Sequence, residues 1–259
     1  MIKRIKYKNC PLVEVVVQVN FPPILSIEAT TPYEFQELIR SEFPEYIVQP
    51  EYESQLLINS QNPQISPLYN QKRTRSIHMF TSDNGLWKLS LSNNMLSLSS
   101  LKYDCWEDMK DKFSNSFKAL LKVYKPSYFN RIALRYIDAF EKDKLNLLNS
   151  EWSELLNPHI CGCFGYTTDG QIKVKTNRVD AEIQFENATV KVIAGIGNVN
   201  HHDGNPPTEA FILDCDYYNI GRFRVDQFYS IADSIHERTS LFFRDAITEK
   251  LHNAMDPDN

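Results

Sequence analysis

Glycine and long apolar runs are scarce in this chain. It has 8 glycines in 259 residues, whereas aromatic residues make up 12%. This composition excludes collagen-like and loop-rich proteins and favours strands with large packed side chains. The five cysteines are odd in number and scattered, so we expect free thiols in a reducing cytoplasm. No segment approaches the roughly 18 uninterrupted apolar residues of a membrane span, and we therefore expect a soluble protein without a membrane partner.

Positive charge is also in short supply. The net charge is -5; residues 1–125 carry +2, from 15 basic and 13 acidic residues, and residues 126–259 carry -7, from 13 basic and 20 acidic residues. A sequence-independent grip on a phosphate backbone needs basic residues concentrated on one surface. Nucleic acid is therefore not expected to be the main ligand.

Several familiar catalytic motifs are missing from the sequence. Gly195-Ile196-Gly197 follows a predicted strand, but no helix pattern comes after it, so a dinucleotide-binding loop is not predicted. His236-Glu237 lacks the second histidine of a metalloprotease helix, because position 240 is serine. A phosphate-binding Gly-Lys-Ser/Thr loop and a serine nucleophile elbow are absent as well. The motifs therefore name no reaction.

The hydrophobic pattern nevertheless predicts a clear order of elements in residues 1–125. Val13 to Phe21 alternates as a strand with one apolar face, and Thr31-Pro32 opens a helix that ends near Phe43. Apolar residues from Trp106 to Tyr124 recur at steps of three and four, which predicts an amphipathic helix. Between the two helices, four strands are predicted at about 46–58, 74–81, 86–92 and 95–101.

The same order is predicted again in residues 126–259. Phe129 to Phe140 is a strand, Glu151 to Asn157 a short helix, and the apolar residues from Val225 to Leu251 predict one helix of roughly 30 residues. Four strands lie between these helices, at 171–176, 181–186, 189–194 and 210–218. We therefore predict an α+β protein of two similar halves, residues 1–125 and 126–259, packed as one unit. Each half is a curved antiparallel sheet gripped by one long helix, a helix-grip-like arrangement.

The polar faces of three predicted strands carry the first candidate site. Alternation places Arg131 and Arg135 on one face of a strand, Asp214 and Asp216 on one face of another, and Glu14 on the polar face of the first. Three carboxylates could hold Mg²⁺ or Mn²⁺ while two arginines bind phosphate, as in an enzyme acting on phosphorylated substrates or nucleotides. The favoured interpretation is plainer: cross-strand ion pairs on a sheet face.

A second candidate has the residue types of a zinc site. His159, Cys161 and Cys163 lie close together in the sequence, and His201 and His202 follow in a later segment. Zinc sites favour two or more residues between paired cysteines, whereas here there is one. Two loops without metal are therefore the preferred interpretation.

Four segments carry a resemblance to a known family. They are Pro11 to Pro22, Phe43 to Tyr46, Asn130 to Asp138 and His236 to Thr248. Through these segments the chain resembles a family of sporadically distributed, uncharacterised prokaryotic proteins of about this length. The resemblance covers nearly the whole chain and implies horizontal transfer, as for phage-defence or toxin-antitoxin genes. It supplies no catalytic residues.

These observations favour a non-catalytic binding module of a prokaryotic multicomponent system. Such a module would recognise a small ligand or a protein partner encoded by a neighbouring gene, and it needs no cofactor. The metal-dependent enzyme is the alternative. For Glu14 and Arg131 we also predict a structural role, in which the two side chains pair in a groove between the halves and Arg131→Ala lowers stability without altering a ligand site.

Overall fold

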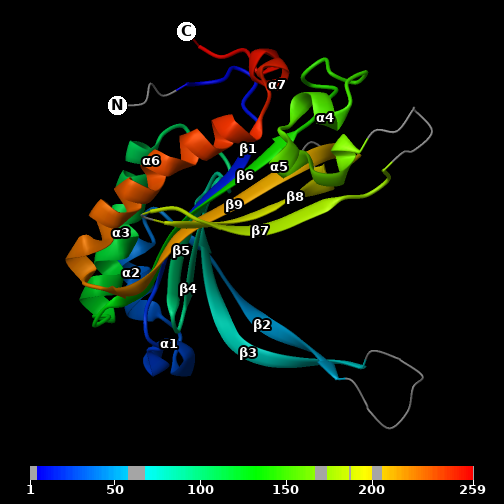
Figure 1. Ribbon diagram of the computed structural model, residues 1–259. Helices are drawn as coiled ribbons and strands as arrows, with labels where there is room; N and C mark the ends of the chain where they lie inside the picture. Colours follow the sequence, from blue (N-terminus) through cyan, green and yellow to red (C-terminus); the bar gives the residue numbers. More distant parts are fainter. Residues whose placement is uncertain (1–4, 58–67, 167–173, 187, 200–205, 259) are drawn as a thin grey trace.

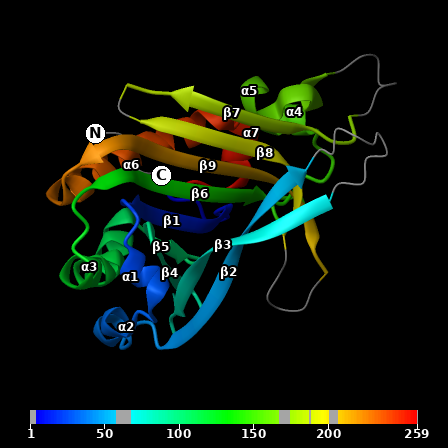
Figure 2. The same ribbon diagram turned by 90° about the horizontal axis from the view of Figure 1, so that it is seen from below.

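The computed structural model contains one continuous antiparallel sheet. It describes residues 5–57, 68–166, 174–186, 188–199 and 206–258. The nine strands are β1 Leu12–Asn20, β2 Glu45–Leu57, β3 Leu68–Thr81, β4 Trp87–Ser92, β5 Met95–Ser100, β6 Phe129–Phe140, β7 Arg178–Gln184, β8 Thr189–Val199 and β9 Thr208–Phe223. Their order across the sheet is β2-β3-β4-β5-β1-β6-β9-β8-β7, so β2 and β7 are the edges (Figures 1 and 2).

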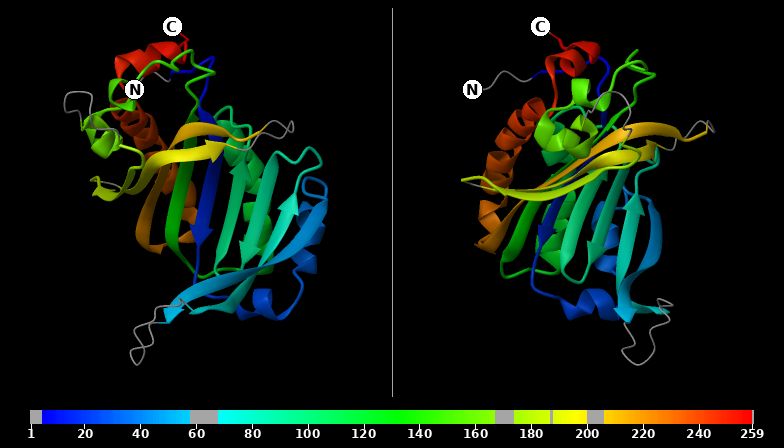
Figure 3. Two further views of the ribbon diagram at one scale, coloured as in Figure 1. Left: turned by 90° about the vertical axis from the view of Figure 1, so that its right-hand side faces the viewer. Right: turned by 45° about the vertical axis from the view of Figure 1, so that its right-hand side comes forward.

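The helices are short apart from two, and these two lie along one face of the sheet. The α-helices are α1 Leu25–Ala29, α2 Tyr33–Ile39, α3 Trp106–Val123, α4 Trp152–Leu155, α5 Pro158–Cys161, α6 Phe228–Ala246 and α7 Glu249–Ala254, and the 3-10 turns are η1 Gly162–Gly165 and η2 Val225–Gln227. Figure 3 shows the strands in front of α3 and α6, and no helix of the described residues covers that side of the central strands. None of the described helices is long and apolar enough to cross a membrane.

Strand β1 shows how the sequence sets the two faces. Val15, Val17 and Val19 are buried on the helix side, while Glu14 and Gln18 are half-buried on the open side. The alternation of apolar and polar residues therefore predicts the buried face correctly. β1 pairs with β5 along one edge and with β6 along the other, which puts it near the middle of the sheet.

The prediction of two similar halves, each a sheet gripped by its own long helix, is wrong. β1 and β6, which open the two predicted halves, pair antiparallel with each other, with Val16 opposite Arg135. The two sets of strands therefore form one sheet, and neither has an edge at the junction. Merging satisfies the backbone N–H and C=O groups that two separate sheets would have left exposed.

The last predicted helix also needs correction. The helix of roughly 30 residues is α6, with 19 residues, followed by α7, with 6. Between them Ile247 is extended and forms an isolated bridge with Leu156. The Thr248 hydroxyl then accepts a hydrogen bond from the Leu251 amide and caps α7. Thr248 was the local signal for this break.

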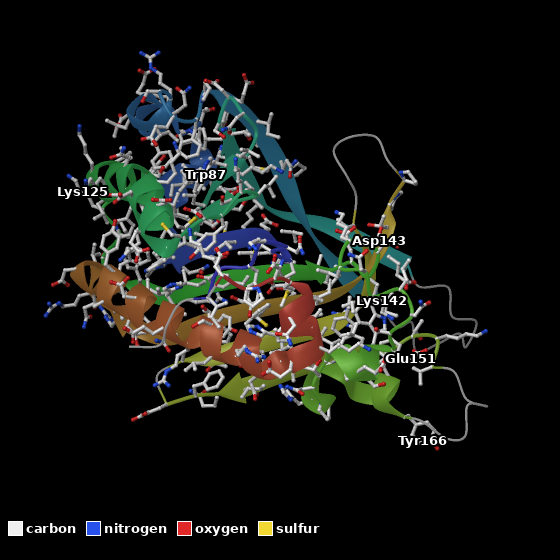
Figure 4. The ribbon with its side chains drawn as sticks, turned by 90° about the horizontal axis from the view of Figure 1, so that it is seen from above. Trp87, Lys125, Lys142, Asp143, Glu151 and Tyr166 are labelled. Carbon is white, nitrogen blue, oxygen red and sulfur yellow. The ribbon has the colours of Figure 1, made fainter. Side chains whose placement is uncertain are left out.

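Of the four strands predicted in the second set, three are found, as β7, β8 and β9, and each is longer than predicted. Residues 174–177 form no strand, and residues 171–173 lie outside the described part of the chain. The short helix predicted at 151–157 is α4, and a further short helix, α5, follows Asn157. Lys142 and Glu151, labelled in Figure 4, lie beside α4, where the Lys142 ammonium is 4.2 Å from the centre of the Trp152 ring.

An aromatic cluster joins the two long helices to the sheet. Phe228 of α6 stacks on Phe117 of α3 with ring centres 4.7 Å apart, and it also contacts Phe113 and, in β6, Phe129. All four side chains are buried. This cluster fixes α3 and α6 against β6.

Candidate functional site

The open face of the sheet holds the predicted arginines and aspartates as two ion pairs. The Arg131 guanidinium donates to Asp216 at 2.6 Å, and Arg135 donates to both carboxylate oxygens of Asp214, at 2.7 and 2.5 Å. The ring of Tyr218 lies 4.7 Å from the Arg131 guanidinium carbon. The hydrogen bonds to Asp214 raise the pKa of Arg135. Both arginines are therefore occupied by carboxylates of the same face.

The structure does not assemble a metal site from these carboxylates. Among the described residues, the one group of three potential ligands with atoms within 4.8 Å of each other is Asp104, Cys105 and Asp108, at the start of α3. Glu14, Asp214 and Asp216 form no such group. The arrangement is that of cross-strand ion pairing.

The predicted pairing of Glu14 with Arg131 is wrong. Glu14 lies opposite Ile137, whereas Arg131 lies opposite Asn20, six residues further along β1. At 3.3 Å per residue the two positions are about 20 Å apart. The stabilising role of Arg131 now rests on Asp216 and Tyr218.

We expect Arg131→Ala to lower the free energy of unfolding by about 1 kcal/mol, since it removes a half-buried ion pair and a cation–π contact. Arg224→Ala is the control, because Arg224 pairs with Asp226 where both side chains are well exposed. Urea denaturation at neutral pH measures both variants. Equal midpoints for the two would contradict this role.

The structure describes three of the five residues predicted as zinc ligands. His159 lies in α5 with its Nε2 3.5 Å from Asp245, Cys161 is buried and Cys163 is exposed in η1. His201 and His202 lie outside the described residues. All five cysteines are free thiols, as predicted.

A cavity of about 250 Å³ lies on the other face, between the sheet and α6. It is lined by the N-terminal segment, the start of β1, the residues just before α3, and parts of β6, β9 and α6. The lining residues are Ile5, Lys6, Tyr7, Cys10, Pro11, Leu12, Tyr103, Asp104, Tyr136, Asp138, Leu213, Cys215, Tyr217, Thr239, Ser240 and Phe243. It is larger than the roughly 150 Å³ apolar cavity known to take up benzene, so a small molecule fits.

Asp138 is the distinctive residue of this cavity. It lies on the apolar face of β6, with Tyr136 and Phe140, and is 6% exposed. No described residue donates a hydrogen bond to its carboxyl group or pairs with it. Burial alone raises its pKa to about 8, because the charged form loses water without gaining a partner. At neutral pH, Asp138 is therefore mostly a neutral acid.

The cavity floor next to Asp138 consists of weakly acidic groups. Cys215 and Tyr217 lie side by side on β9 and hydrogen-bond to each other, and burial raises the pKa of both. The Tyr136 hydroxyl lies 2.9 Å from Nδ1 of His236, whose ring stacks on Trp106. The floor thus joins the sheet, α6 and α3.

The N-terminal segment covers one side of the cavity. The Tyr7 hydroxyl lies 2.8 Å from Nδ1 of His252 in α7, and the backbone of Lys8 and Asn9 donates to Asp256 and Met255. Lys6 at the rim pairs with Asp104 at 2.9 Å. The segment and the end of the chain therefore hold each other in place (Figure 1).

Sequence reasoning missed this site although the signal was present. In β6, the alternation Ile132, Leu134, Tyr136, Asp138, Phe140 puts an aspartate in an apolar series. A lone acid on an otherwise apolar strand face is the signal for a buried titratable group. The predicted candidate residues, in contrast, all lay on the polar faces of the strands or in the predicted zinc loops.

No protein-family model matches the chain, and no curated protein is significantly similar to it. The resemblance to a prokaryotic family therefore stays a prediction. The evidence for a function therefore comes from the residues that line the cavity.

Proposed function

We propose that this protein is a non-catalytic binding module that holds a small ligand in the cavity around Asp138. The observation that carries the proposal is an aspartate that lines a cavity of about 250 Å³, is 94% buried and has no partner among the described residues. A buried acid without a partner destabilises a fold, and perturbed acids in concave sites are typical of functional positions.

The cavity chemistry favours binding over catalysis. A catalytic cysteine needs a lowered pKa, whereas burial raises the pKa of the Cys215 thiol. Tyr7 and Tyr217 also have raised pKa values because of burial, so their hydroxyls are poor nucleophiles near neutral pH. These side chains therefore line the cavity and offer hydrogen bonds to a bound ligand.

The proposal keeps the wider context that the sequence suggested. The module serves a prokaryotic multicomponent system, such as one of phage defence or a toxin-antitoxin pair. A protein encoded by a neighbouring gene binds the module according to whether the cavity holds its ligand. This context rests on the family resemblance alone. The metal-dependent enzyme gains no support from the ion-paired open face.

The test is native mass spectrometry of the protein coexpressed with its genomic neighbours and purified gently. We expect a small ligand on the wild type and none on Ser240→Trp, because the exposed Ser240 lines the cavity mouth on α6 and an indole there closes it. Glu237→Trp, on the same helix but outside the lining, is the matched control and keeps the ligand. A neighbour protein in the spectrum supports the context.

An empty wild type under these conditions would argue against a ligand-binding module. Equal ligand occupancy in wild type and Ser240→Trp would show that the ligand is bound elsewhere. Either result would contradict the proposal that a ligand binds in the cavity around Asp138.

A further inference from the structure

The walls of the cavity point to one class of ligand. Five aromatic side chains line it: Tyr7, Tyr103, Tyr136, Tyr217 and Phe243. The faces of such rings carry negative electrostatic potential and attract cations. Neutral ligands gain less from these faces.

Three of the tyrosine rings that line the cavity with Asp138 meet one another at steep angles. Tyr103 and Tyr136 have centres 5.9 Å apart and planes at 85°, and Tyr136 and Tyr217 have centres 6.3 Å apart and planes at 78°. Rings at near right angles form the corners of a box rather than a flat stack. A box of aromatic faces is the arrangement that recognises alkylated ammonium groups.

The charges around the box agree with this geometry. Of the described residues that line the cavity, Lys6 is the single lysine or arginine, and its ammonium lies at the exposed rim against Asp104. No described cation neutralises Asp138. A ligand that brings its own positive charge supplies the partner that the buried carboxyl group lacks.

We propose that the cavity binds a small organic cation of the alkylammonium class, held by the Asp138 carboxylate and the faces of Tyr103, Tyr136 and Tyr217. This inference rests on the proposed function, since it names the ligand class for the same cavity. The ammonium group sits at the Asp138 end, and its alkyl part extends along Phe243 towards Ser240. The volume suits a molecule of about ten non-hydrogen atoms.

The binding step includes a proton. Asp138, with a pKa of about 8 in the empty cavity, must release its proton to become the anion that pairs with the cation. The apparent affinity is reduced by the fraction of protein that is ionised, so we expect it to rise on the order of fiftyfold between pH 6 and pH 8.5. The other titratable groups around the carboxyl are Lys6, Tyr7, Cys10, Tyr103, Asp104, Tyr136, Cys215 and Tyr217, with His236 behind Tyr136.

The test is isothermal titration calorimetry of the full chain with choline and with its neutral carbon isostere, in which a tert-butyl group replaces the trimethylammonium group. At pH 8.5 we expect choline to bind at least about tenfold more tightly than the isostere. At pH 7, titration in buffers of different ionisation enthalpy should show release of close to one proton per choline bound. Glu237→Trp is the control with unchanged affinity.

Asp138→Asn separates charge from shape. We expect this variant to lose the proton release and most of the preference for choline, keeping only the part that the ring faces supply, while still binding the isostere. If the isostere bound as tightly as choline to the wild type, or if neither probe bound, the inference of a cationic ligand would be overturned. The proposed function fails by a different result, an unoccupied wild type in the native spectrum, so the two failures can be told apart.

Discussion

Asp138→Asn is expected to make the protein more stable above neutral pH. Asp138 has a pKa of about 8 in the folded protein and about 3.9 in the unfolded chain, so between these values the folded state holds a proton that the unfolded state has lost. The wild type therefore loses stability as pH rises from about 4 to about 8, at up to about 1.4 kcal/mol per unit, and asparagine removes this loss. The gain above pH 8 is on the order of 4 to 6 kcal/mol.

Urea denaturation of both proteins at pH 5, 7 and 9 measures this difference. Tyr7, Cys10, Cys215 and Tyr217, whose pKa values are raised in the folded protein, are present in both proteins, so their contribution cancels in the comparison. His78, whose pKa burial lowers, titrates in both proteins and cancels in the comparison. Asp143→Asn, at an exposed position labelled in Figure 4, is the control that keeps the wild-type pH dependence. A constant difference between wild type and Asp138→Asn at all three pH values would refute the raised pKa.

Phe228→Ala has the second large expected effect, in the opposite direction. Phe228 is fully buried and contacts rings of α3, α6 and β6, so truncation leaves a hole that spans all three elements. We expect a loss of about 3 to 5 kcal/mol in the free energy of unfolding, measured by urea denaturation at pH 5, where the wild type retains most of the Asp138 contribution.

Leu241→Ala is the matched control because Leu241 is on the same helix and 43% exposed. It should lose less than about 1 kcal/mol, since little apolar surface leaves the core. A loss of similar size in both variants would mean that α6 stability, rather than the aromatic cluster, sets the effect.

Local hydrophobic periodicity was sufficient to predict the type and bounds of the helices and strands that have a strong apolar pattern. The alternation in β6 predicted Phe129 to Phe140, the bounds that the structure has, and the apolar spacing predicted α3 to within one residue. Both predictions depend on side chains that are near each other in the chain. The same patterns show which face of an element is buried.

The arrangement of strands lay beyond these patterns. Val15 and Val17 would be buried in the same way whether β1 were the edge of a small sheet or a central strand, so alternation could not show that β1 pairs with β6. The register of that pairing also places Glu14 and Arg131 far apart, because Arg131 lies opposite Asn20 rather than opposite Glu14. Long-range pairing is a property of the whole sheet.

The candidate site was missed for a related reason. Charged residues on polar faces, such as Arg135 and Asp214, stand out by composition but neutralise each other across strands. The apolar series in β6 marks Asp138 as unusual, but the series does not show that α6 covers this face or that a cavity lies there. The pKa of Asp138 depends on burial, which no local window of sequence contains.

The two edges of the sheet restrict how this protein can associate with others. β7 presents Arg178, Asp180, Glu182 and Gln184 as exposed side chains, and β2 contains Pro50, which has no N–H group to offer a further strand. Charged side chains and proline on edge strands oppose the addition of a strand from another molecule. Growth of the sheet into fibrils or strand-swapped chains is thereby disfavoured, and a partner approaches through the faces of the sheet or the surfaces of the helices.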